Sequence, residues 1–211
     1  MVAKEEYIFG FIDIETTGHD PLKKVGNVLV PWHEIIEIGM VVADQPNFDK
    51  LGEFEIKINP QHPERCISNL INEYPKRAFN GEWNDAVSLN CALKKLFEFL
   101  GQWQEKIIPT GHNFFFDWNF LQVAFVCCDI LNEDLSRFFH YTRLDTRSMA
   151  VQELLEPNVI YDPREFSVRS GKISKRLGIK QEPYPHTALN GAMQSYKIFK
   201  KIRENVNQNL K

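Results

Sequence analysis

Two carboxylates that lie two residues apart, Asp13 and Glu15, come at the end of an apolar run that begins at residue 7. The run is nearly continuous and predicts a strand over residues 7–14 that is buried on both faces. Side chains at positions i and i+2 of a strand share a face, so the two carboxylates should converge on one spot. Like charges held there repel each other unless a cation or a proton lies between them. Because Mg²⁺ and Mn²⁺ prefer oxygen ligands, the pattern predicts a metal site at the end of a central strand.

The composition is that of an ordinary globular protein. The chain has 211 residues, of which 43% are hydrophobic and 25% charged, so we expect one domain over residues 1–211 and exclude a disordered chain. A net charge of −3 gives no overall basic surface for wrapping a duplex. The sequence shows neither a signal-peptide pattern nor an apolar run of membrane-spanning length, and its four cysteines form no CxxC pair. We therefore expect a cytoplasmic, reduced protein with no membrane partner.

The order of the expected elements predicts one mixed sheet with helices packed on it. Three strands joined by short connections should form an antiparallel meander, and a fourth, short strand should follow the first long helix. The spacing of apolar residues predicts five helices, the first capped by Ser88 or Asn84. The strands are expected over residues 7–14, 34–43, 52–58 and 106–111, the helices over 88–103, 118–130, 146–155, 173–177 and 187–205, and a turn-rich insertion over 23–31.

A second informative segment, GHNFFFD over residues 111–117, follows the fourth strand. Asp117 would open the next helix, whose positive end favours a carboxylate, beside the strand ends where open α/β sheets bind ligands. By itself an aspartate at the position of Asp117 is more often a helix N-cap than a metal ligand. We expect His112 and Asn113 to fix the turn by local hydrogen bonds. The three phenylalanines should mainly pack, although one of them would also suit stacking on a base.

A third segment, HTALNGA over residues 186–192, lies near the start of the last expected helix. His186 suits a general base, because the ordinary pKa of histidine lies close to neutral pH.

These three segments, in this order, resemble the DEDDh family of 3′-to-5′ exonucleases in the ribonuclease H-like superfamily, and the resemblance runs over nearly the whole chain. It implies an α/β, ribonuclease H-like three-layer fold with a five-stranded mixed sheet flanked by helices. It also implies that two ions, Mg²⁺ or Mn²⁺, are held by Asp13, Glu15 and Asp117, and that His186 takes a proton from the attacking water. Contacts with the terminal nucleotide would come from a separate set of residues. This set is Thr16, Thr17, Gly18 and Asn113.

The chain departs from the family motif at one position. The motif H-x-A-x-x-D places a fourth acid five residues after the histidine, where this chain has Gly191. Loss of one preorganised charged group typically costs on the order of 10²–10³ in rate. Either the natural residue has been replaced, or the chain is a degenerate member of the family, or another acid substitutes. Asp145 and Asp162 are the nearest candidates in the matched segments, although Asp145 is more simply a helix cap.

The leading function is therefore a metal-dependent 3′-to-5′ exonuclease acting on single-stranded DNA or RNA, weakened by the missing carboxylate. The rival is an inactive exonuclease fold that binds nucleic acid or a protein. Expected partners are single-stranded 3′ ends, contacted near the site by Lys172, Lys175 and Arg176. A homodimer and a polymerase or RNA-processing partner both stay open, as does the choice between DNA and RNA.

Overall fold

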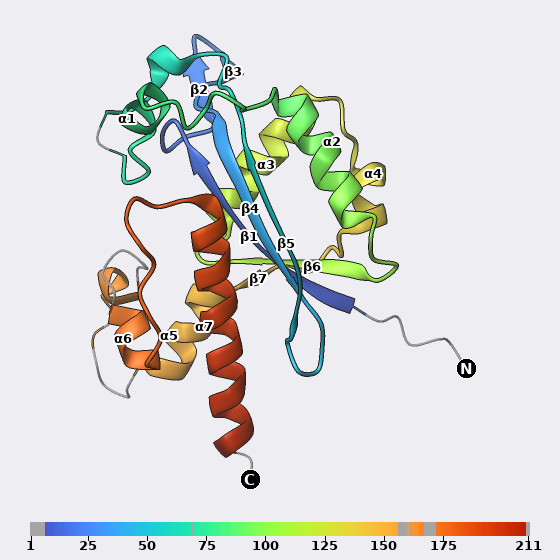
Figure 1. Cartoon of the computed structure of the whole chain (residues 1–211), viewed down its shortest axis with the longest axis vertical. Helices are drawn as coiled ribbons and strands as arrows, with labels where there is room; N and C mark the ends of the chain where they lie inside the picture. Colours follow the sequence, from blue (N-terminus) through green and yellow to red (C-terminus); the bar gives the residue numbers. More distant parts are fainter. Residues whose placement is uncertain (1–6, 69, 156–159, 161, 167–171, 210–211) are drawn as a thin grey trace.

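A five-stranded mixed sheet lies at the centre of the computed structural model, which describes residues 7–68, 70–155, 160, 162–166 and 172–209 (Figure 1). Its strands have the order β5-β4-β1-β6-β7. They are β1 (Tyr7–Thr16), β4 (Ile35–Ala43), β5 (Lys50–Lys57), β6 (Lys106–Gly111) and β7 (Leu144–Asp145). The strands β1, β4 and β5 pair antiparallel, whereas β6 pairs parallel with β1 and β7. The predicted meander and the predicted mixed α/β sheet are confirmed.

Helices cover both faces of this sheet (Figure 1). One face packs on α2 (Leu89–Leu100), α3 (Phe115–Cys127) and α4 (Asn132–Phe138). The other face packs on the long helix α7 (Ala188–Asn209), beside which lie α5 (Thr146–Leu154) and α6 (Lys172–Leu177). The remaining helices are α1 (Tyr74–Phe79) and the short 3₁₀ turns η1 (Pro63–Arg65) and η2 (Pro163–Phe166). No helix in the part of the chain described is long and apolar enough to cross a membrane.

The alternation of side chains along β1 divides the core in two. Ile8 and Ile12 pack in the cluster beneath α2 and α3, whereas Phe9 and Phe11 pack against α7. Since odd positions point to the α7 face, Asp13 and Glu15 continue the row of Phe9 and Phe11 toward the start of that helix. The apolar row therefore ends in two carboxylates on one face, as the sequence predicted.

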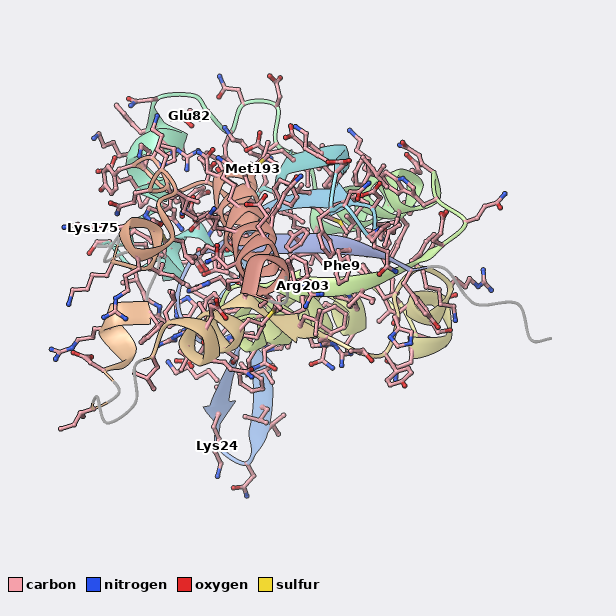
Figure 2. The ribbon with its side chains drawn as sticks, turned by 90° about the horizontal axis from the view of Figure 1, so that it is seen from below. Phe9, Lys24, Glu82, Lys175, Met193 and Arg203 are labelled. Atoms are coloured by element: carbon pink, nitrogen blue, oxygen red, sulfur yellow. The ribbon has the colours of Figure 1, made fainter. Side chains whose placement is uncertain are left out.

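Three predictions about the elements were wrong. The insertion over residues 23–31 is a hairpin of β2 (Leu22–Val25) and β3 (Val28–Pro31), which projects from the body with Lys24 near its tip (Figure 2). The apolar side chains of the hairpin are largely exposed. Its sequence therefore lacks the apolar pattern by which a buried strand is recognised. The helices α1 and α4 were not predicted, although α6, which is equally short, was. Helix α3 begins at Phe115, so Asp117 lies within its first turn instead of before it.

A buried ion pair joins α1 to the sheet and to the start of α7. Arg77 on α1 donates from its guanidinium to Glu37 on β4 at 2.8 Å, and both side chains are buried. The second carboxylate oxygen of Glu37 accepts the N–H of Ala188, the first residue of α7, at 3.1 Å. Burial raises the pKa of Glu37, and the charge of Arg77 opposes that shift. Arg77 also donates to the carbonyls of Asn72 and His186. One side chain therefore links the loop before α1 to the segment before α7.

Glycine at position 39 allows α7 to begin directly on the sheet. A Cβ on Gly39 would lie 2.1 Å from the carbonyl carbon of Ala188 and 2.2 Å from the nitrogen of Leu189. No larger residue fits there without moving the helix. Because Gly39 is the register partner of Asp13, the first turn of α7 is placed over the carboxylates of β1.

We expect Arg77→Met to lower the free energy of unfolding by about 3–5 kcal/mol, because it leaves Glu37 buried without its partner charge. Urea denaturation followed by circular dichroism measures the change. The matched control is Lys50→Met, which breaks a partly exposed ion pair with Glu53 and should cost less than about 1 kcal/mol. An equally small effect of both changes would contradict the role given to Arg77.

Candidate active site

The end of β1, the first turn of α3 and the segment before α7 enclose one cavity of about 230 Å³. Its lining includes the three acids and the histidine that the sequence analysis assigned to the metal site and the base. These are Asp13, Glu15, Asp117 and His186. Gly191 lines it too, from the second turn of α7. Segments from both ends of the chain therefore meet at the end of β1, the central strand of the sheet.

Asp13 lies among the other carboxylates. Loss of solvation raises the pKa of Asp13 well above its ordinary range, and the charges of Asp117, Glu15 and Glu182 raise it further. A proton or a cation is needed to neutralise such a group of charges.

Asp117 is held in place by the backbone of β1. Its side chain is buried, and Oδ1 accepts the N–H of Ile14 at 3.1 Å. Burial raises the pKa of Asp117 well above its ordinary range, although the Ile14 N–H opposes the shift. This bond crosses from α3 to the strand beside Asp13, so the third carboxylate is fixed relative to the first two.

Asn72 holds the carboxylate of Glu15. Its side-chain nitrogen donates to Glu15 Oε2 at 2.9 Å and to the carbonyl of Thr16 at 3.0 Å. Its side-chain oxygen accepts the N–H of Tyr74. Asn72 is buried and lines the cavity. The sequence analysis missed it because it stands in a loop with no periodic pattern.

Glu182 is a further carboxylate in the cavity that the sequence analysis did not single out. Its Oε2 lies 3.3 Å from Nδ1 of His186, and its side chain is only 3% exposed. The other oxygen, Oε1, is buried and has no hydrogen-bond partner among the residues that the structure describes. Burial raises the pKa of Glu182 to about 8, and the charge of Glu15 adds to the shift. The one available signal was its position four residues before His186, which loop sequence alone does not make informative.

Gly191 lies directly against Asp13. A Cβ on Gly191 would lie 2.3 Å from Oδ2 and 2.5 Å from Cγ of Asp13. The carboxylate of Asp13 thus takes the space that a side chain at position 191 would need.

The two acids that the sequence offered as substitutes both have other partners. Asp145 caps α5, as expected, by accepting the N–H of Arg147 at 2.8 Å, and it also accepts the N–H of Asn113. Asp162 pairs with the exposed Arg164. Neither of these acids lines the cavity.

The residues expected to contact a nucleotide divide into two groups. Thr16 and Asn113 line the cavity. Thr17 is fully buried, with its hydroxyl accepting the N–H of Glu34, and Gly18 lies against the ring of His33. These last two stand outside the lining.

His112 fixes the turn after β6, but its partners are distant in sequence. Its Nε2 lies 2.9 Å from the carbonyl of Phe166 and its Nδ1 lies 3.1 Å from the hydroxyl of Thr146. Burial lowers the pKa of His112 to about 4, so the ring is neutral at pH 7 and its one proton lies on Nε2. Of the three phenylalanines that follow, Phe114 is buried in the core and Phe116 lines the cavity. Phe115 is 77% exposed, so the expectation of packing fails for it.

The donor set suits hard divalent cations. Among the residues that the structure describes, no three Asp, Glu, His or Cys side chains already converge tightly enough to hold an ion. Four carboxylates nevertheless face one cavity, and one of them has a buried oxygen with no partner. Oxygen ligands of this kind are those that Mg²⁺ and Mn²⁺ prefer.

The family of the chain follows from its sequence. The ribonuclease T family model, described as an exonuclease family, matches residues 11–199, so this chain belongs to that family. No curated protein sequence matches it significantly.

Solved structures agree on the fold at low sequence identity. The nuclease domain of 3′hExo, a DEDDh family member bound to rAMP, is 16% identical with a TM-score of 0.59, over 98% of this chain and 94% of that one. A 3′-exonuclease that recognises the histone mRNA stem-loop is 15% identical with a TM-score of 0.65, over 95% and 64% of the two chains. Exonuclease I of E. coli with a dT13 oligonucleotide is 12% identical with a TM-score of 0.64, over 98% and 43%. This chain thus spans less than two-thirds of the length of two of these proteins.

The pKa of His112 predicts a loss of stability in acid. Between pH 6.5 and pH 4 the unfolded chain binds a proton at this histidine that the folded chain does not. The stability due to neutral His112 is therefore complete above pH 6.5 and falls as the pH drops, by about 3 kcal/mol at pH 4. In EDTA, the stability advantage of wild type over His112→Gln should shrink by this amount from pH 7 to pH 4. A difference that stays constant from pH 7 to pH 4 would contradict the prediction.

Proposed function

We propose that this chain is a divalent-cation-dependent 3′-to-5′ exonuclease that hydrolyses terminal phosphodiester bonds of single-stranded DNA or RNA. The observation that carries the proposal is the convergence of three carboxylates and a histidine in one cavity. Membership of the exonuclease family and the fold of the solved 3′-exonucleases support it.

In this proposal Asp13, Glu15 and Asp117 hold two ions, Mg²⁺ or Mn²⁺. When bound, such ions lower the pKa of a water molecule and neutralise charge that develops on the phosphate. The chain supplies the fixed positions, because the Ile14 N–H orients Asp117 and Asn72 orients Glu15. Carboxylates that are already oriented need little rearrangement during the reaction.

His186 is assigned as the general base. Its Nδ1 is engaged by Glu182, so Nε2 is the nitrogen that we assign to take the proton from the attacking water. The carbonyl of His186 accepts a hydrogen bond from Arg77, which fixes the backbone that carries the ring.

The substrate is the end of a single strand. A cavity of about 230 Å³ suits one terminal nucleotide better than a base pair. Thr16, Asn113 and Phe116 would contact the nucleotide, and Arg147 in the same lining carries a positive charge suited to a phosphate. Solved relatives with dT13 and with rAMP support both DNA and RNA as substrates.

The test uses 5′-labelled single-stranded DNA and RNA oligomers with Mn²⁺ or with EDTA. We expect products that shorten from the 3′ end in Mn²⁺ and none in EDTA. Asp117→Asn keeps an acceptor for the Ile14 N–H but removes the charge, so it should slow the reaction on the order of 10²–10³. The control Asp162→Asn changes a partly exposed acid outside the cavity and should keep the wild-type rate.

Internal cleavage, or cleavage that is unaffected by EDTA, would overturn this function. A folded wild-type protein that binds the oligomers without shortening them would favour the rival, an inactive exonuclease fold that serves as a binding module.

A further inference from the structure

We propose that Glu182 supplies the fourth carboxylate of the cation site, in the role that the family motif gives to position 191. The inference rests on the proposed function, because it concerns a ligand of the same site. It assigns a role to a residue outside all three motifs.

The space at position 191 is already filled. Any Cβ there would lie within 2.3–2.8 Å of the carboxylate atoms of Asp13, which is closer than real contacts allow. Asp13 is itself confined, since Gly39 opposite it lies against the first turn of α7. In this arrangement a side chain at position 191 requires the carboxylate of Asp13, the free end of a flexible side chain, to move away.

Glu182 has the burial and the missing partner that a ligand position requires. Its side chain is 3% exposed, it lines the cavity with Asp13 and Glu15, and its Oε1 has no hydrogen-bond partner. Its nearest charges within the cavity include the like charges of those two acids. A buried carboxylate oxygen without a donor is costly, so a cation is the group that would make this position favourable.

A second buried glutamate in the same chain shows the contrast. Glu37 is fully buried, but one of its oxygens receives Arg77 and the other receives the N–H of Ala188. Both oxygens of Glu37 are therefore satisfied by the fold. Glu182 has His186 on one oxygen only, and its other oxygen is left for a ligand that the fold does not provide.

The position of Glu182 also joins the cation site to the base. With Oε2 3.3 Å from Nδ1 of His186, the same carboxylate that faces the cation orients the imidazole. A carboxylate beside one ring nitrogen favours the histidine tautomer and orientation that place the proton on that nitrogen. Glu182 makes this link from the segment before α7, the segment that also carries His186. An aspartate at position 191 would extend from α7 itself and would not make the link in this way.

The experiment is a calorimetric titration of Mn²⁺ into the whole chain without substrate, for wild type, Glu182→Gln and Glu73→Gln. Glu73 is the matched control, because it accepts the hydroxyl of Tyr184 from the same segment as Glu182 but lies outside the cavity. We expect Glu182→Gln to weaken Mn²⁺ binding by about 10–100-fold and the control to leave it unchanged.

Thermal unfolding supplies an independent readout. In EDTA, Glu182→Gln should unfold at the same temperature as wild type or higher, since it removes an acid from a crowded group. In saturating Mn²⁺ the order should reverse, because the ion stabilises wild type more. Equal or greater stability in EDTA also excludes misfolding as the cause of weaker binding.

A third variant, Gly191→Asp, distinguishes this proposal from the alternative in which the site has lost the carboxylate of position 191 and has no substitute for it. Gly191→Asp should lower both Mn²⁺ affinity and exonuclease rate, because its side chain meets Asp13.

An increase in either quantity, or Mn²⁺ affinity that Glu182→Gln leaves unchanged, would overturn the role of Glu182. A slower rate for Glu182→Gln at unchanged Mn²⁺ affinity would reduce Glu182 to positioning His186. If wild type neither binds Mn²⁺ nor shortens an oligomer, the proposed function fails together with this inference.

Discussion

The contact between the start of α7 and β4 determines where the side chains of the cavity stand. Glycine at position 39 lets the helix approach the sheet, and Glu37 accepts the first N–H of the helix while Arg77 neutralises its charge. A buried carboxylate is costly without its partner charge. The pair of Glu37 and Arg77 therefore fixes the start of α7 relative to β4 and α1. That geometry brings His186 and position 191 to the end of β1, where the alternation of the strand has placed Asp13.

The structure separates buried charges that the fold satisfies from buried charges that it does not. Glu37 has donors on both oxygens, so it serves the packing of α7. Asp13, Asp117 and Glu182 lie within one cavity and each has a pKa above its ordinary range, because burial and like charges both disfavour ionisation. Unfavourable electrostatics confined to one cavity is typical of a site that awaits a ligand. The same protein thus contains a buried charge that serves packing and buried charges that we assign to the proposed site.

Sequence reasoning succeeded where a residue's role depends on its near neighbours. β1 and β4 are buried on both faces and therefore read as apolar runs, and α2 carries both an amphipathic period and the Ser88 cap. It failed for α1, which is shorter than two helical turns, and for the exposed hairpin. In the cavity, two acids on one strand could be read from their spacing. Asn72 and Arg77 could not, because each acts on a partner far away in sequence. Glu182 could not, because a spacing of four residues before His186 carries no information in a loop.

Position 191 shows why counting acids along a motif misjudges a site in space. A glycine early in α7 costs about 1 kcal/mol relative to alanine, yet the helix continues through it, with the Gly191 N–H bonded to Thr187. The Glu37 bond to Ala188 and the Thr187 hydroxyl, which accepts the N–H of Asn190, secure the turn in which the glycine stands. A site can therefore give up the helical carboxylate if another reaches the same cavity. From a loop, the longer side chain of Glu182 reaches this cavity, and its Oε2 lies 3.3 Å from Nδ1 of His186.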